Sequence, residues 1–503
     1  MQLAVTNASE PYISRLPTEI LTEIFLLCAD EPVRGESRGY RVWWGSIMRV
    51  CRHWHDVAAR SASLWTNIVF TPYQLTELML QRSLSAPISI YYNFAFDYVT
   101  TAMDEDAVIL ALGHLPRARD IEIHGPMLLI HDLAKRMVKP APELESLCLR
   151  NMKAGLGLGL KGVLPDLLGG VAPRLRRLSL SGTTIPLSSP ILTRLTHLSL
   201  DGIPASASFS SEQLQTCLRV LALHLQELLI CFDNGDLPVA APLSEMGAGP
   251  TSLICMPELT VLTLHATVQF VSDLVDHLVI PFDARMKIVL SPPLISGPLV
   301  PGFMDPVSSA DRTRLWHSVI VFFGSYGIEL LAYTSADYKH AYVHCSAHPL
   351  QQANVLGNIC GLLPFRDVYA LRIEVSDVAR RAQENTGHRK YTRAEWRSIF
   401  SAFTNVRKVE LIDIPLGHFI GAVERSGGEA SEVPLVLEMR ELSVGRSDLR
   451  RNFNDGYWGR RLLLQELMVY TPFFRLRSKR GSPVESITFQ DHRLSREEVR
   501  ALR

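Results

Sequence analysis

The chain has 503 residues, of which 47% are hydrophobic and 20% are charged, and these fractions are typical of a globular protein with a large apolar core. Its 51 basic and 51 acidic residues give a formal net charge of zero, which argues against broad electrostatic binding to nucleic acid. The length suits about two to four domains, or one small domain followed by a long repeat array.

Targeting signals are not recognisable in the sequence. The segment MQLAVTNASEPYISRLP lacks the basic start and apolar centre of a secretory signal, and no run of about 20 apolar residues predicts a membrane span. The eight cysteines are scattered, with no C-x-x-C pair, and most lie in apolar runs. Buried free thiols in a reducing compartment fit this pattern, so we expect a cytoplasmic or nuclear protein without membrane or nucleic-acid partners.

The first recognisable element is RLPTEILTEIFLLCA, residues 15–29, which predicts an amphipathic helix. Pro17 suits a first helical turn, where its missing N–H costs nothing. Threonine and glutamate occupy one side, and a loop at 30–41 should follow. Apolar side chains recur at steps of three and four at Leu16, Ile20, Leu21, Ile24, Phe25 and Cys28.

The next segment, VCRHWHDVAARSASLWTNI at 50–68, concentrates cysteine, histidine and tryptophan. Cys51, His53 and His55 could begin a metal site, but histidines two apart point in different directions on a helix. A docking face is therefore favoured, because a unit of about 50 residues cannot bury so many large apolar side chains by itself. The predicted face of this helix contains Trp44, Ile47, Val50, Cys51, Trp54, Val57 and Ala58.

Three ordered blocks, LPTEILTEIF, VCRHWHDVA and LWTNI, resemble the F-box, in the F-box-like variant common in fungi. The resemblance implies a helical domain at 12–70 that binds the Skp-type adaptor, and through it the cullin, of Skp–cullin–F-box ubiquitin ligases. The alternative is a plain helical hairpin packed on the chain's own C-terminal domain. The adaptor-binding residues implied by the resemblance are Leu16, Pro17, Ile20, Leu21, Ile24, Phe25, Val50, Cys51, Trp54, Leu64 and Trp65.

Beyond a helical or extended connector at 71–115, the pattern apolar-x-x-apolar-x-apolar recurs through residues 116–503. Its last two apolar residues would point inward from a short strand, and the first would seat the preceding turn. Such units bury their faces only by stacking on one another. The pattern occurs at 118/121/123, 144/147/149, 175/178/180, 195/198/200, 225/228/230, 259/262/264, 368/371/373, 406/409/411, 439/442/444, 464/467/469 and 484/487/489.

This pattern resembles a degenerate leucine-rich repeat, so the predicted fold class is α+β or α/β: a small helical F-box followed by an irregular leucine-rich-repeat-like solenoid. Helices are predicted at 271–280 and in TRAEWRSIFSAF at 392–403, where Thr392 and Glu395 can form a capping box. The proline-rich segment 281–312 predicts a long loop that interrupts the array. Residues 313–362 alternate like strands and indicate distorted repeats.

Other candidate sites are weaker. GLGLKG at 157–162 fits a dinucleotide loop, but no acidic residue follows about 20 positions later, so an inter-repeat loop is favoured. His340, His344 and His348 recur at steps of four beside Cys345, as zinc ligands on a helix can, but they also fit one strand face. The basic runs at 388–390 and 475–480 look loop-like. We predict no catalytic, cofactor-binding or metal-binding residues.

The sequence therefore predicts a substrate receptor of a ubiquitin ligase that is not itself an enzyme, with repeats that bind a target protein the sequence does not identify. Two alternatives remain open at this stage. One is a scaffold that binds the adaptor without degradation of a target. The other is an enzyme with a site in 281–362, which rests only on the histidine cluster.

Overall fold

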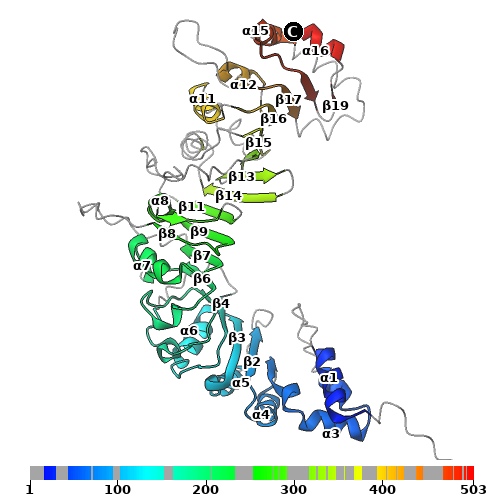
Figure 1. Ribbon diagram of the computed structural model, residues 1–503, viewed down its shortest axis with the longest axis vertical. Coiled ribbons are helices and arrows are strands. Elements are labelled where there is room, and N and C mark those ends of the chain that lie inside the picture. The colour runs from blue at the N-terminus through cyan, green and yellow to red at the C-terminus, as the bar shows by residue number, and fades with distance from the viewer. Residues whose placement is uncertain are drawn as a thin grey trace, which may run out of the picture. The chain divides into compact units, whose positions relative to one another are not determined.

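The computed structural model describes residues 16–29, 43–69, 72–93, 102–151, 163–204, 207–232, 253–275, 277–281, 284–291, 317–324, 327–335, 338–346, 356, 368–376, 393–403, 405–414, 416–423, 438–445, 468–479, 481–489, 492–493 and 496–502. They belong to two compact units, Met1–Ser208 and Phe209–Arg503, and each is described by itself. The structure is mixed α/β, with a small helical region at the N-terminal end and mostly parallel strands beyond it (Figure 1). Within the described residues, no helix has the length and apolar character needed to cross a bilayer.

The helical region of the first unit is broken where the sequence predicted one continuous face. Cys51 has extended backbone angles (φ −159°, ψ 169°), and its Sγ accepts the N–H of Trp54 at 3.5 Å. Because this satisfies a free N–H at a helix start, the cysteine begins a new helix instead of continuing the old one. The elements are α1 (Thr18–Ala29), α2 (Trp43–Ile47), α3 (Arg52–Arg60) and the 3-10 turn η2 (Ala62–Trp65).

The sheet of the first unit is parallel, and its strands lie in the order of the sequence. Residues 71–115 contribute directly to it, because β2 pairs with both β1 and β3. The strands are β1 (Asn67–Val69), β2 (Ile88–Asn93), β3 (Ala118–Gly125), β4 (Ser146–Asn151), β5 (Arg177–Ser181) and β6 (His197–Ile203), and the helices between them are α4 (Tyr73–Arg82), α5 (Ala102–Leu112) and α6 (Met127–Arg136).

The apolar triplets fall on these strands in register. Ile121, Leu147, Leu178 and Leu198 are direct partners across β3 to β6, and all are buried. The residues two positions further along are buried too, whereas the intervening residues are only partly buried. This alternation is that of strands with one face on a core, so the predicted strand positions are confirmed.

Backbone hydrogen bonds also connect the turns that precede successive strands. In the first unit, the N–H of Glu145 donates to the carbonyl of Arg119 at 2.7 Å. In the second, the N–H of Arg407 donates to Tyr369 at 2.9 Å, and that of Arg440 donates to Arg407 at 2.8 Å. These hydrogen bonds between neighbouring turns align the starts of successive strands.

The second unit contains a sheet in which one group of strands departs from chain order. Parallel pairs join β7 to β9, β9 to β11 and β11 to β14, and then β12 to β15 and onward to β18. The described strands are β7 (Glu227–Phe232), β8 (Ile254–Cys255), β9 (Val261–Thr267), β10 (Leu278–Val279), β11 (Arg285–Ser291), β12 (Ser318–Phe323), β13 (Gly327–Ser335), β14 (Tyr338–Ser346), β15 (Ala370–Val375), β16 (Lys408–Ile412), β17 (Glu441–Gly445), β18 (Ser486–Phe489) and β19 (His492–Arg493).

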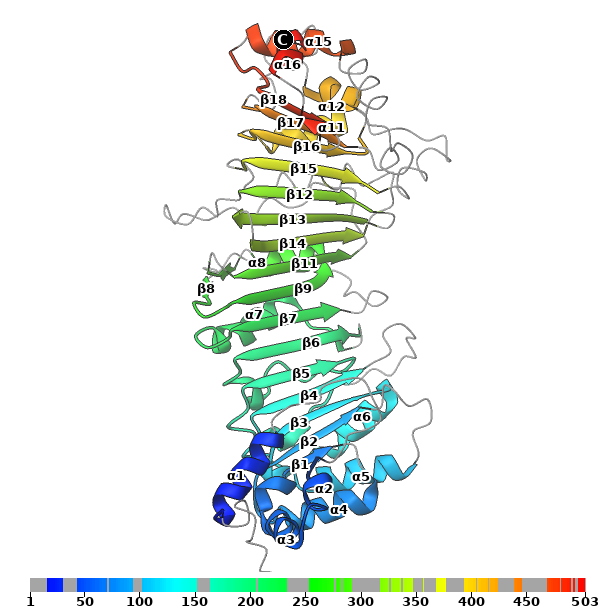
Figure 2. The same ribbon diagram turned by 90° about the vertical axis from the view of Figure 1, so that its right-hand side faces the viewer.

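An antiparallel meander lies in the middle of this parallel sheet. β12, β13 and β14 pair in sequence as antiparallel neighbours, but β14 lies beside β11 and β12 lies beside β15 (Figure 2). The chain therefore passes over two strand positions after β11 and returns to fill them. This insertion accounts for the strand-like alternation predicted for 313–362.

The predicted loop at 281–312 is wrong over Arg285–Ser291, which forms β11. Met286, Ile288 and Leu290 alternate inward there and are buried, so the strand pattern prevails over the nearby prolines. Residues 292–312 lie outside the part of the chain that the structure describes, as does GLGLKG at 157–162.

The predicted helices are largely confirmed. The helix at 392–403 is α11 (Arg393–Ser401), with Trp396, Ile399, Phe400 and Phe403 buried, although Thr392 of the expected capping box lies outside the described residues. The helix predicted at 271–280 is α8 (Val268–Val275), which begins and ends nearer the N-terminus than predicted, and the strand β10 (Leu278–Val279) occupies the end of the predicted range. The described α-helices of this unit are α7 (Ser211–Leu221), α8 (Val268–Val275), α11, α12 (Leu416–Val423), α15 (Thr471–Lys479) and α16 (Arg496–Leu502).

Two predictions near the C-terminus are corrected. In the triplet 464/467/469, the described residues Met468 and Val469 are helical and largely exposed, so this copy forms no strand there. The basic run at 475–480 is helical through Lys479. Arg477 within it is buried, and its guanidinium donates to the carbonyl of Met439 at 3.0 Å, because the long side chain can reach the turn before β17.

We predict that Leu147→Ala lowers the free energy of unfolding of the first unit by about 2–5 kcal/mol, since it removes buried volume from the middle of the ladder. Ser146→Ala, next to it but only partly buried, is the control and should cost less than about 0.5 kcal/mol. Urea unfolding followed by circular dichroism measures both. Equal effects would contradict the inward–outward assignment of β4.

Candidate partner-binding surface

The inner face of α1 packs against the other helices of the helical region. Leu21 and Phe25 are buried, and the Phe25 ring lies 5.1 Å from that of Trp54, centroid to centroid, at an interplanar angle of 60°. The hydroxyls of Thr22 and Ser61 are hydrogen-bonded at 3.0 Å. These contacts connect α1 to α3 and to the residue that follows it.

The outer face of α1 carries apolar side chains that remain accessible. Ile20, Ile24 and Leu27 are 49%, 36% and 71% exposed, and their spacing of four and three places them along one side of the helix. We call these three residues the α1 stripe. Val50, before α3, is 59% exposed. Exposed aliphatic side chains grouped on a small helical scaffold are typical of a protein-binding surface.

Trp65 joins the helical region to the sheet. It is 1% exposed, its Nε1–H donates to the carbonyl of Ala58 at 2.8 Å, and the guanidinium of Arg82 on α4 lies 4.3 Å from its ring centroid. β1 begins two residues later and pairs with β2, where the N–H of Ser89 donates to the carbonyl of Thr66 at 3.0 Å. The last block of the F-box resemblance is therefore also the start of the sheet.

The residues expected to bind the adaptor fall into a buried group and an accessible group. Leu21, Phe25, Leu64 and Trp65 are buried in the chain's own core, so their side chains fill the interior and offer no surface. Pro17, Ile20, Ile24, Val50 and Cys51 are exposed, and Leu16 and Trp54 are partly exposed; these are available to a partner.

Leu27 was missed by the sequence reasoning. It is the most exposed member of the α1 stripe, and the signal for it was present as the seven-residue step from Ile20.

Among the described residues, His53 and His55 of the segment 50–68 belong to no group of neighbouring metal-ligand side chains. His53 and His55 are both exposed, and His55 Nδ1 lies 3.4 Å from Asp56 Oδ1. Cys51 is occupied as the cap of α3.

A different cysteine–histidine group lies on the sheet of the first unit. Glu122 and His124 alternate on β3, and Cys148 on β4 is the direct partner of Glu122. One donor atom from each lies within 4.8 Å of the others. Hydrogen bonding to Cys148, and secondarily to Glu122, raises the pKa of His124 to about 9, although partial burial opposes the charged form. This group could not be predicted from the sequence, because no residue spacing along the chain reveals a pairing between strands.

The histidines at 340–348 lie on a strand where they are described. His340 and His344 belong to β14, so the four-residue spacing that would bring them together on a helix separates them along the strand. His344 Nδ1 lies 3.8 Å from Glu329 Oε1 on β13, and burial lowers the pKa of His344. His348 lies outside the described residues. The helical zinc arrangement does not fit this geometry.

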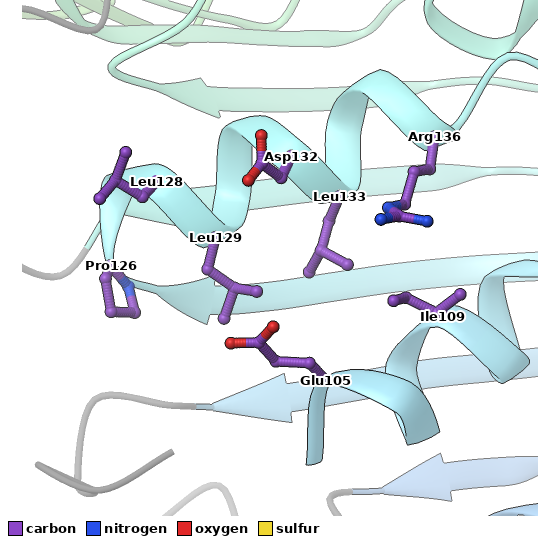
Figure 3. Close-up of a pocket in the computed structure, with 8 residues that line it drawn as sticks. All are labelled: Glu105, Ile109, Pro126, Leu128, Leu129, Asp132, Leu133 and Arg136. Atoms are coloured by element: carbon purple, nitrogen blue, oxygen red, sulfur yellow. The ribbon is translucent and has the colours of Figure 1, made fainter. Parts of the chain in front are cut away.

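A shallow hollow of about 280 Å³ lies between α5 and α6. Figure 3 shows Leu129 and Leu133 of α6 pointing toward Glu105 and Ile109 of α5, with Arg136 at one end. This volume is slightly below the range of typical small-molecule sites, about 300–1,000 Å³. It is large enough for one side chain of a partner. No sequence pattern predicted it.

The small helical region, with its filled core and exposed apolar stripe, defines a protein-interaction domain. Residues 13–71 match the family described as F-box-like, so the chain carries an F-box-like domain at its N-terminal end. Domains of this family are interaction modules that bind Skp-type adaptors. No curated protein sequence matches the chain.

We predict that Trp65→Ala costs about 3–5 kcal/mol of stability, because it removes a buried side chain and leaves the carbonyl of Ala58 without its donor. Ile24→Ala, on the exposed stripe, should cost less than about 1 kcal/mol. Thermal unfolding of the two variants measures the difference. A small loss for Trp65→Ala would show that the helical region does not depend on this anchor.

Proposed function

We propose that this protein is a substrate receptor of a Skp–cullin–F-box ubiquitin ligase. In this proposal, the F-box-like domain binds the Skp-type adaptor, the adaptor connects it to the cullin, and the sheet binds a target protein. The chain itself catalyses no step, and its contribution is to hold the target near the ligase. The domain assignment at residues 13–71 supports the first part.

The α1 stripe is the observation that carries the proposal. The core of the domain is already filled by Leu21, Phe25 and Trp65, so Ile20 and Leu27 are not needed to complete it. Burying the stripe against a partner would gain roughly 25 cal/mol for each Å² of apolar surface removed from water. A hairpin that served only to pack on its own C-terminal domain would leave less of this surface exposed.

We predict that the double substitution Ile20→Asp/Ile24→Asp reduces retention of the full-length chain by an immobilised Skp-type adaptor at least tenfold. Two carboxylates would have to be desolvated in an apolar interface, which costs more than the contact returns. Val220→Asp, an exposed apolar position on α7, is the matched control.

The control variant should bind as the unsubstituted chain does. Equal retention of the double variant and the unsubstituted chain would refute adaptor binding through the α1 stripe. Circular dichroism of each variant establishes that the helices persist.

For the target-binding part, we propose that residues 116–503 form a leucine-rich-repeat-like solenoid that follows the F-box-like domain at 12–70. The pairing of β2 extends this array into 71–115. In-register parallel strands, buried triplets and joined turns support a repeat architecture, because each unit buries its face against its neighbours.

The outward face of the meander is the best candidate for the target surface. Ile320 and Phe322 on β12 and Leu331 on β13 are apolar but only partly buried, because they lie on the face opposite the buried core. Ile320 and Leu331 are direct partners, and Tyr342 on β14 is the next partner in the same row. Aliphatic and aromatic side chains grouped in this way are typical of the centre of an interface.

Charged side chains lie beside this apolar group. Arg372 on β15 is the direct strand partner of Ile320. Its guanidinium nitrogens lie 2.8 Å from Glu374 Oε2 and 3.6 Å from Glu410 Oε1. On the other side, the ammonium group of Lys287 lies 5.8 Å from the Tyr342 ring centroid. An apolar centre with charged neighbours is the usual anatomy of a protein-binding site.

We predict that Phe322→Asp weakens proximity labelling of target proteins about tenfold and leaves adaptor retention unchanged, because it puts a charge in the centre of the proposed target surface. Ser199→Asp, on the outward face of β6, is the control. The full chain is used, since deletion of residues 1–72 would also remove β1. Unchanged labelling with Phe322→Asp would place target binding elsewhere.

A further inference from the structure

We propose that Glu122, His124 and Cys148 bind one Zn²⁺ ion on the outward face of the first unit's sheet. Thiolate, imidazole and carboxylate are the ligand types that zinc uses in proteins. One thiolate and one carboxylate also balance the charge of the dication. On binding, the thiol of Cys148 loses its proton to solvent, and so does any protonated imidazole.

The strands place the three donors together before any ion arrives. Ile121, Ile123, Leu147 and Leu149 are buried, and the alternation of the strands therefore turns Glu122, His124 and Cys148 to the opposite face. The three donor atoms lie within 4.8 Å of one another. A tetrahedral zinc ion holds its donors roughly 3.3–3.8 Å apart, given its bond lengths. Glu122 Oε1 and His124 Nε2 are already 3.0 Å apart.

His124 provides the second, independent observation. It is only 9% exposed, and its Nε2 lies 3.0 Å from Glu122 Oε1, so two of the three proposed ligands already approach each other at ion-pair distance. A nearly buried imidazole nitrogen needs a polar partner, and a metal ion held between the imidazole and the carboxylate would provide one. The Tyr91 ring lies beside the imidazole in an edge-on arrangement, with the two ring centroids 6.1 Å apart.

The fourth position of the ion would face solvent. Glu122 and Cys148 are both partly exposed, so an ion can enter and a water molecule can complete its coordination. Arg150, the strand partner of His124, is exposed and can turn its positive charge toward solvent.

The second unit offers a matched comparison. Cys231 on β7 is the direct partner of His265 on β9, which gives a cysteine–histidine pair on the outward face. Among the described residues this pair belongs to no group with a third donor atom close enough to complete a site. A site that needs three protein ligands should therefore form at Cys148 and not at Cys231.

Cobalt(II) titration of the full-length, chelator-treated chain under anaerobic conditions tests the proposal. Co²⁺ takes the place of zinc, and a thiolate ligand gives it a sulfur-to-metal charge-transfer absorption band. We expect this band to saturate at one ion per chain and to disappear when one equivalent of Zn²⁺ is added. We also expect zinc to raise the unfolding temperature, because it binds only the folded site.

The variants Cys148→Ser and His124→Gln should weaken Co²⁺ binding by more than about 100-fold, beyond the 10–100-fold typical of losing an outer-shell partner. Cys148→Ser should also abolish the charge-transfer band. Cys231→Ser, the control, should leave band and stoichiometry unchanged. Absence of the band in the unsubstituted chain, its persistence in Cys148→Ser, or its loss in Cys231→Ser would each overturn the assignment. Glu122→Gln provides a further reading if either of the other two ligand variants fails to fold.

Discussion

The stacking of parallel strands in register is the constraint on which the rest of the structure depends. A short strand such as β4 pairs with a neighbour on each side. The same pairing that gives its backbone N–H and carbonyl groups hydrogen-bond partners also buries its leucines. The hydrogen bonds between the turns that precede neighbouring strands hold these strands in the same register. One consequence is that a slip of one residue would turn every leucine to solvent, which makes the register strongly specified.

The F-box-like domain shares in this constraint. Trp65 is buried between α3 and α4, and β1 begins only two residues later, so the domain's last turn also aligns the first strand. Side chains that the family resemblance assigns to a partner can therefore be part of the chain's own core. On α1, the apolar side chains that remain exposed are those on the side away from Phe25.

The sequence predicted local features well where one face of an element is buried. The alternation in SLCLRN and the stripe of Trp396, Ile399 and Phe400 each determine an element, because burial acts on residues close together in the chain. Partners far apart could not be predicted in this way. The order of β12 to β14 depends on which strand edges meet, and the approach of Cys148 to His124 depends on a register between strands. The break at Cys51 depends on a single cap that interrupts a pattern otherwise continuous.

The buried face is fixed by packing, and this leaves the outward face free to differ between the two units. On β3 to β6 it carries glutamate, cysteine and serine, as in the row Glu122, Cys148 and Ser179, whereas on the meander it carries Ile320 and Leu331. Substitutions at these positions cost little stability because the core lies on the other side. The same kind of sheet therefore carries a group of neighbouring donor atoms in one unit and an apolar row of side chains in the other. The reversed strand order of the meander adds to this freedom, because β13 brings a row of side chains to that surface which a simple parallel repeat would not supply.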